Sequence, residues 1–319
     1  MPRARDLGVT IGRFAPGPLN AITDVPGVRI GHVTLIEGDR TRTGATAILP
    51  HGGNLFRDRV SAGFAVLNGF GKFAGSTQVQ ELGELETPVL LTNTLAVGRA
   101  MEALVAHVLA LPGNETVTSI NAVVGETNDS GLNDIRAARP TVAEMRQALE
   151  AASSGPVEEG AVGAGTGCIA FGLKGGIGTA SRRVDGYMLG VLVQANYGGT
   201  LRLDGRAAPE TSEADTDGSI VIVMATDAPL CPRNLRRLAT RSFAGLARTG
   251  SALSNGSGDY ALAFATTRGQ MPNEMMSPMF EAAIETTEEA ILNALLMAGD
   301  MRGWDAATRQ PRQVRGLRL

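Results

Sequence analysis

Short runs of valine, isoleucine and leucine, each bounded by glycine or proline, constrain the fold of this chain more than any other feature. In the first 100 residues they include "GVRIGHVTLIEG", "TGATAILP" and "ETPVLLTNT". Runs of this length between turn residues are typical of buried strands. Residues 160–200 are again glycine-rich and strand-like, and the run "SIVIVMAT" starts at Ser219. The chain is therefore expected to be built around buried sheets.

Helical patterns follow the first strands and then close the chain. They cover residues 96–113, 141–153, 228–250 and 277–299, with expected caps at Thr141, Gly250 and Ser277. Strands and helices do not alternate regularly enough for a (β/α)8 barrel or a doubly wound sheet. The sequence therefore predicts an α/β (α+β) fold, with sheets packed face to face and helices outside.

Composition and charge exclude several classes of protein. The 319 residues carry a formal charge of −3, which implies no general attraction to nucleic acid. The two cysteines, Cys168 and Cys231, give neither a disulfide framework nor the spacing of zinc ligands. No apolar run has the length of a membrane span, and the first residues have no signal-peptide core. A soluble, cytoplasmic protein without a metal is expected.

The glycine-rich stretch "GAVGAGTGCIAFGLKGG" invites a nucleotide-binding interpretation. Gly163 and Gly165 fit a dinucleotide fingerprint, and Asp185 follows at about the place of the ribose-binding acid. However, Cys168 stands where the third glycine belongs, and "GLKGG" lacks the Ser or Thr of a phosphate loop. Glycines that permit tight turns are the favoured interpretation, and nucleotide binding is the weakest alternative.

The junction Gly218–Ser219 invites a catalytic interpretation. The polar segment "GTLRLDGRAAPETSEADTDG" ends there and a strand begins, while no histidine nearby indicates a Ser–His–Asp triad. A serine at a new N-terminus can use its own α-amine as the base, because that amine has a pKa of about 7.7 to 8.0. A glycine before it tolerates unusual backbone angles, and a flexible segment would let the new terminus separate. The structural alternative is an ordinary turn serine.

Several motifs, in order, resemble the DmpA-like family of L-aminopeptidase/D-esterase and β-peptidyl aminopeptidase enzymes. They include "NAITDVPGVRIGHVT", "TGATAILPHGGN", "GAGTG", "GLKGGIGTASR" and "GSIVIVMATDAPL", and the resemblance covers about residues 10–300. It implies one αββα sandwich over residues 1–319, related to ornithine acetyltransferase and assembled as a homotetramer. It also implies self-cleavage of the Gly218–Ser219 bond into residues 1–218 and 219–319.

The same resemblance assigns roles to individual residues. It implies that Ser219 is the nucleophile and that Ser257 and Asp259, in "NGSGDY", orient the new α-amine and relay its proton. Asn196 in "VQANYG" matches the oxyanion-stabilising asparagine, and Glu126 in "ETNDSGLND" is the candidate for holding the substrate ammonium group. For each, the alternative is a polar loop residue that satisfies nearby backbone.

One position departs from the family pattern. Many relatives carry a tyrosine before "LND", where Gly131 stands here, so the second oxyanion donor is a backbone amide or the pocket is wider. The expected activity is that of a serine aminopeptidase or amidase that needs no cofactor and acts on small peptides, amides or esters. The alternatives are an endo-acting hydrolase of polyamide-like oligomers and an uncleaved relative that only binds a small ligand.

Overall fold

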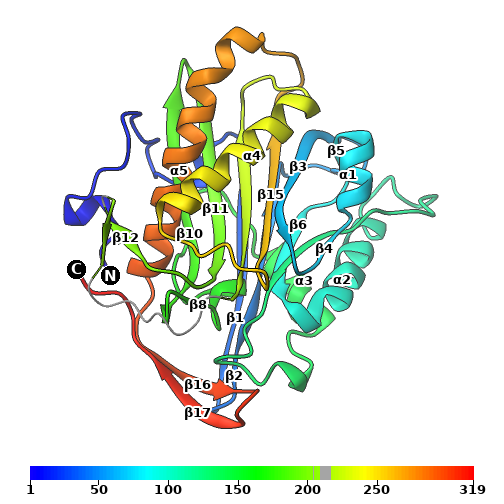
Figure 1. Ribbon diagram of the computed structural model, residues 1–319. Helices are drawn as coiled ribbons and strands as arrows, with labels where there is room; N and C mark the ends of the chain where they lie inside the picture. The colour runs from blue at the N-terminus through cyan, green and yellow to red at the C-terminus, as the bar shows by residue number, and fades with distance from the viewer. Residues whose placement is uncertain (204, 209–216) are drawn as a thin grey trace.

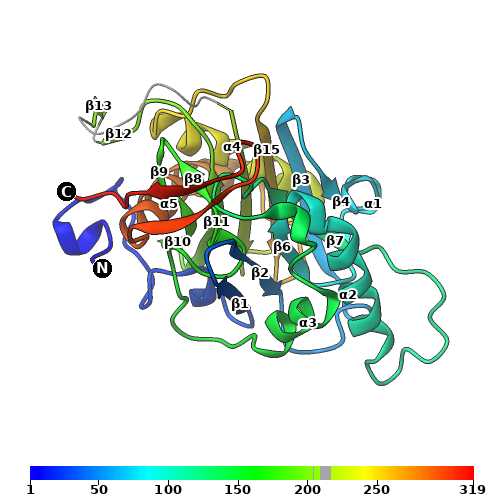
Figure 2. The same ribbon diagram turned by 90° about the horizontal axis from the view of Figure 1, so that it is seen from below.

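The computed structural model describes residues 1–203, 205–208 and 217–319. Within these residues, two β-sheets lie face to face and helices cover their outer faces (Figures 1 and 2). This arrangement confirms the predicted fold class. Of the polar segment that is expected to be flexible, residues 199–218, positions 204 and 209–216 lie outside the described residues.

The larger sheet is built mainly from strands of the C-terminal half of the chain. Its strand order is β10 (Gly176–Val184), β11 (Tyr187–Asn196), β14 (Ser219–Thr226), β15 (Gly258–Ala265), β3 (Val60–Gly69) and β5 (Glu84–Leu85). Helix α5 (Met276–Leu296) packs on β10 and β11, and α4 (Pro232–Arg248) packs on β3 and β15. The strands β14 and β15 run parallel at the centre of this sheet.

The smaller sheet is covered by the first long helices. Its strand order is β1 (Arg29–Glu37), β2 (Thr41–Leu49), β6 (Val89–Asn93), β7 (Val123–Thr127) and β4 (Phe73–Ala74). Helices α2 (Val97–Leu109) and α3 (Val142–Glu150) pack on its outer face, and the short α1 (Ser76–Leu82) packs on β3. The remaining strands form three hairpins: β8 (Ile169–Ala170) with β9 (Leu173–Lys174), β12 (Arg202–Leu203) with β13 (Arg206–Ala207), and β16 (Met301–Asp305) with β17 (Gln310–Val314).

Strand β14 shows why its sequence is continuously apolar. Ile220 and Ile222 face the helices α4 and α5, whereas Val221 and Val223 pack in the core between the two sheets. Side chains alternate between the faces of a strand, so a strand buried on both faces needs apolar residues at every position. The run that begins at Ser219 is therefore the sequence of a central strand.

The helix ends test the expected caps. Thr141 caps α3, because its hydroxyl accepts from the backbone N–H of Glu144 while the Glu144 carboxylate accepts from that of Thr141. Gly250, with φ of +90°, follows the last turn of α4, as expected. The cap predicted at Ser277 is wrong. A 3₁₀ turn runs directly into α5, which begins at Met276 without a side-chain cap.

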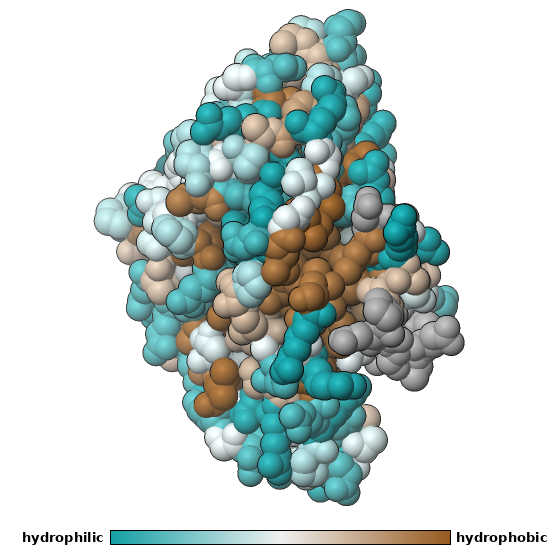
Figure 3. Space-filling model, turned by 90° about the vertical axis from the view of Figure 1, so that its left-hand side faces the viewer, coloured by the Kyte–Doolittle hydropathy of each residue, from teal (hydrophilic) through white to brown (hydrophobic). Residues whose placement is uncertain are grey.

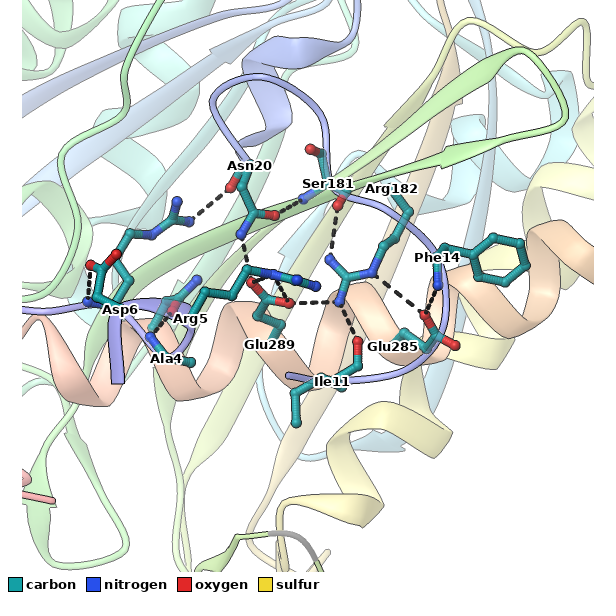
Figure 4. A network of polar contacts seen from close by, with 12 residues as sticks. Ala4, Arg5, Asp6, Ile11, Phe14, Asn20, Ser181, Arg182, Glu285 and Glu289 are labelled. Carbon is teal, nitrogen blue, oxygen red and sulfur yellow. Dashed lines mark hydrogen bonds and ion pairs between the residues drawn. The ribbon is translucent and has the colours of Figure 1, made fainter. Parts of the chain in front are cut away.

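A buried ionic network ties the N-terminal segment to the helical layer (Figure 4). The guanidinium of Arg182, on β10, lies 2.6 Å from Glu289 and 3.5 Å from Glu285, both on α5. Arg5 and Asn20, from the N-terminal segment, also bond to Glu289. Because all the charges of this cluster are paired, it joins three distant segments without leaving an isolated buried ion.

The two ends of the chain lie close together. Figure 3 shows the face on this side, where hydrophobic residues form a patch among hydrophilic ones. A hollow of about 360 Å³ is lined by residues of both ends, including Met1, Leu7 and Leu317. Among the helices of the described residues, none combines the length and apolar character needed to cross a bilayer.

Candidate active site

A cavity of about 380 Å³ gathers most of the residues that the sequence singled out. Ser219, Gly218, Asn196 and Glu126 all line it. The topology explains this meeting, because Asn196 ends β11 and is paired with Ser219, which begins β14. Glu126 comes from β7 of the other sheet, which contacts β14. The cavity therefore lies where the two sheets meet at one end of their central strands.

Ser219 and the carbonyl before it share one backbone donor. The N–H of Gly258 lies 3.1 Å from the Ser219 Oγ and 3.3 Å from the carbonyl oxygen of Gly218. This contact follows from the register, since Ser219 and Gly258 are partners in the parallel ladder. Sequence reasoning missed Gly258, because the N–H of a backbone leaves no signature in side chains. The serine hydroxyl is thus held beside the peptide group of its own N-terminal bond.

Gly218 occupies a position that only glycine fits. Its φ is +144°, and a Cβ there would lie 2.3 Å from the carbonyl oxygen of Asn196 and 2.6 Å from the Cα of Tyr197. Side chains rarely adopt such a φ, and contacts below 3 Å require backbone movement. The peptide bond before Ser219 is therefore held against β11 in an unusual conformation.

Ser257 and Asp259 form a pair next to this junction. The Ser257 hydroxyl donates to the Asp259 Oδ1 over 2.6 Å, and both residues are buried. The other oxygen, Oδ2, has no hydrogen-bond partner among the described residues. Burial raises the pKa of Asp259, although the hydrogen bond from Ser257 opposes the shift. A buried carboxylate with one free oxygen is suited to receive a cationic or N–H partner.

Asn196 is fixed at both ends of its amide. Its Oδ1 accepts from the N–H of Ile169 over 2.9 Å, and its Nδ2 donates to the carbonyl of Asn128 over 3.1 Å. An amide nitrogen carries two hydrogens, so one remains for a group inside the cavity. The side chain is nearly buried and lines the cavity, which makes it a preorganised donor.

The carboxylate of Glu126 already lies near a cation. Its Oε1 accepts from the backbone N–H of Lys72 over 2.9 Å, and its Oε2 accepts from the Thr94 hydroxyl. The Lys72 ammonium lies 3.7 Å away and is half exposed, whereas Glu126 is buried. The cavity thus contains a fixed anionic group that can bind an ammonium ion.

The glycine-rich stretch forms the wall behind Asn196. Lys174 is fully buried, and its ammonium donates to the carbonyls of Gly165, Cys168 and Gly175. Burial lowers the pKa of Lys174 to about 8. A Cβ at Gly165 would lie 2.4 Å from the N–H nitrogen of Ile177, so this glycine serves close packing. Lys174 was missed from the sequence, where it appeared only as part of an incomplete phosphate loop.

Within the described residues, the histidines and acidic side chains form neither a histidine-based catalytic centre in this cavity nor a metal site. His32 is largely buried beside Thr46, and burial lowers its pKa to about 4. None of the three histidines lines the cavity of Ser219. Across the parts of the chain that the structure describes, no three His, Cys, Asp or Glu residues are grouped so as to hold a metal ion.

Comparison with solved structures identifies the class of protein. The fold matches an L-aminopeptidase D-Ala-esterase/amidase from Ochrobactrum anthropi with a TM-score of 0.90 and 36% identity, over 100% of this chain and 96% of that one. That protein is described as a prototype of the serine aminopeptidases and a variant of the Ntn hydrolase fold. A β-aminopeptidase from Burkholderia sp. matches with a TM-score of 0.91 and 42% identity over 99% and 95%. The chain therefore has the fold of the Ntn hydrolases.

The sequence comparisons then give the family. The chain belongs to peptidase family S58, whose model matches residues 20–309. It is 41% identical to the β-peptidyl aminopeptidase BapA of Sphingosinicella microcystinivorans, over 97% of this chain and 89% of that protein. The resemblance drawn from the motifs is confirmed, and the chain is an aminopeptidase-family hydrolase that acts on amide bonds.

Proposed function

We propose that this chain is a self-processing serine aminopeptidase whose nucleophile is Ser219. The observation that carries the proposal is the Gly258 N–H, which bonds to both the Ser219 Oγ and the Gly218 carbonyl. A donor on that carbonyl oxygen stabilises negative charge when the neighbouring hydroxyl attacks. The glycine at position 218 supports the same step, because a residue without a Cβ can place its carbonyl in this close position beside β11.

Maturation proceeds in two steps. The Ser219 Oγ attacks the Gly218 carbonyl carbon, the C–N bond breaks, and the acyl group moves to the oxygen as an ester, while the hydroxyl proton passes to the departing nitrogen. Water hydrolyses the ester, leaving a carboxylate on Gly218 and a free α-amine on Ser219. The new amine has a pKa near 8, so a useful fraction is neutral at pH 7 and can act as a base.

The mature site then acts on a substrate amide. The Ser219 amine removes the proton of its own hydroxyl, which attacks the substrate carbonyl, and the free N–H of Asn196 donates to the resulting oxyanion. The departing amine takes up the proton, and water releases the acyl group from Ser219. Asp259 accepts from Ser257 through its Oδ1, and its free Oδ2 supplies the acceptor that orients the α-amine.

Glu126 supports an exo-acting enzyme. Its fixed carboxylate in the cavity pairs with the ammonium group of a substrate N-terminus, in exchange for the half-exposed Lys72. An endo-acting amide hydrolase has no use for such a contact. Glu126→Gln separates the two, because it weakens the hydrolysis of substrates with a free N-terminus and leaves N-acetylated ones unaffected. Assembly as a homotetramer of processed pairs, and a cytoplasmic location, belong to the same proposal, and the native mass tests the former.

Intact mass and a denaturing gel test the proposal, with wild type beside Ser219→Ala. Wild type is expected to yield a fragment of 319 − 218 = 101 residues that begins Ser-Ile-Val-Ile, whereas Ser219→Ala stays one chain. Ser242→Ala is the matched control, because Ser242 is a buried serine on α4 outside the cavity, and it should be cut normally. A wild-type chain that remains at 33.1 kDa after long incubation would refute self-processing and favour a protein that only binds a ligand.

A further inference from the structure

The C-terminal hairpin contributes a cationic group to the same cavity. Arg312, on β17, lines the cavity together with Ser219 and Gly131. A Cβ on residue 131 would lie 3.2 Å from the Nη1 of Arg312 and 2.8 Å from the Cδ1 of Ile169. Because residue 131 has no side chain, Ile169 and the guanidinium of Arg312 occupy the space that a Cβ there would need. Figure 1 shows the hairpin β16–β17 at the lower end of the molecule, beside β2.

Most of the donors of Arg312 remain available. Within the described residues, its guanidinium has one ionic contact, at 3.3 Å from the Asp305 Oδ2. The other oxygen of Asp305 accepts from the backbone N–H groups of Ala307 and Thr308, which fix the carboxylate in the hairpin turn. A guanidinium carries five N–H donors in a planar fork, so one long contact leaves most of them free.

Two cations, Lys72 and Arg312, line the cavity beside the acidic residues Glu126, Asp217 and Asp305. Lys72, the other cation that lines it, lies beside Glu126, so Arg312 is the cation not paired with the predicted ammonium-binding group. The side chain of Arg312 is 36% exposed, which leaves it accessible to a ligand in the cavity. The planar fork of a guanidinium can form two parallel hydrogen bonds with the two oxygens of a carboxylate, as it does with phosphate.

We propose that Arg312 is a specificity-determining residue that binds a carboxylate of the substrate. The inference rests on the proposed aminopeptidase function. The carboxylate comes from one of two sources: the free C-terminus of a short peptide or the acidic side chain of the residue that is released. With Glu126 holding the ammonium group, the cavity takes small zwitterionic substrates in preference to amides of the same size that lack the carboxylate.

Two substrate pairs test the proposal. Ala-Ala is compared with Ala-Ala-amide, which differ in the C-terminal carboxylate, and aspartyl p-nitroanilide is compared with asparaginyl p-nitroanilide, which differ in the side chain. Arg312→Gln is expected to lower the ratio of kcat/KM for the member with the carboxylate over the member without it by about tenfold in one pair, as expected for a partly exposed charge-assisted hydrogen bond. Arg312→Lys, which keeps the charge but not the fork, should retain part of the ratio.

Arg309→Gln is the matched control. Arg309 lies in the turn of the same hairpin but lines a different hollow, next to Arg40 and Trp304. Its loss removes the same charge from the protein, so long-range attraction alone would change the ratio equally in both variants. The ratio is expected to change only with Arg312, and equal changes would overturn the proposal.

A binding measurement separates this inference from the proposed function. Calorimetry on the Ser219→Ala protein compares the Kd of Ala-Ala and Ala-Ala-amide, and of aspartyl and asparaginyl amides, with and without Arg312→Gln. Selective loss of affinity for one ligand that has the carboxylate supports the inference and identifies the source of the carboxylate, even if wild type shows no turnover. Equal Kd changes for the ligands with and without the carboxylate would overturn it, whatever the fate of the aminopeptidase function.

Discussion

Replacing Asn196 by alanine separates a catalytic from a structural role more sharply than any other change in the cavity. The substitution removes the N–H proposed for the oxyanion, and loss of one such donor typically lowers kcat by about 100- to 1,000-fold. It also removes the partners of two backbone groups, the N–H of Ile169 and the carbonyl of Asn128. Both effects are expected, and they are measured independently.

The structural loss follows from the two hydrogen bonds. A buried backbone group left without a partner costs about 1 to 3 kcal/mol. Asn196 borders the cavity and is 7% exposed, so water can reach the vacated groups and the lower end of the range applies to each. We expect the free energy of unfolding to fall by about 2 kcal/mol in sum, while kcat falls by at least about 100-fold.

Asn293→Ala provides the matched comparison. Asn293, on α5, makes the same pair of contacts: its Oδ1 accepts from the N–H of Ala4, and its Nδ2 donates to the carbonyl of Thr179. It does not line the cavity. Urea denaturation and turnover of an aminoacyl p-nitroanilide, both well below the unfolding transition, compare the variants. If the two substitutions lower stability and kcat alike, the oxyanion role of Asn196 is refuted.

Two further substitutions test the buried charges. Burial raises the pKa of Asp129 to about 7 in the folded chain, against about 3.9 when unfolded, so the folded state retains a proton that the unfolded state loses as pH rises between these values. Wild type should therefore lose stability relative to Asp129→Asn from pH 4 to pH 7, by up to about 4 kcal/mol. A difference in urea midpoint between the two proteins that stays the same at pH 4, 5.5 and 7 would contradict this. Arg182→Met should lower the free energy of unfolding by about 3 to 5 kcal/mol, because Glu285 and Glu289 lose a buried counter-ion. A change in denaturation midpoint worth less than about 1 kcal/mol would show that the remaining partners of the two carboxylates suffice.

Local sequence signals predicted the elements well. The apolar run after Gly218 identifies a central strand, and Thr141, expected as a cap, forms a capping box with Glu144 three residues later. Ser277 was misplaced for a local reason as well, since a preceding 3₁₀ turn supplied the first turn of α5. The face-to-face packing of the sheets followed from the order of strands and helices.

The geometry of the candidate site could not be predicted from local patterns. Family resemblance singled out Ser219 and Asn196, but only the antiparallel pairing of β11 with β14 places them side by side. The N–H of Gly258 carries no sequence signature, and Arg312 reaches Gly131 from 181 positions later in the chain. Lys174 was visible only as one charged residue in an apolar, glycine-rich stretch, and the carbonyls that hold it are backbone groups.

The position of β14 and β15 within the larger sheet determines what a cut before Ser219 would do to refolding. Both strands belong to the piece 219–319, yet they lie between β11 and β3 of the other piece. The two polypeptides would be interleaved rather than docked, so neither could leave without breaking the sheet. After unfolding, the two separate pieces would have to meet again before the sheet could form. Recovery from denaturant would therefore become second order in protein concentration. The uncut Ser219→Ala chain would recover at a rate independent of concentration.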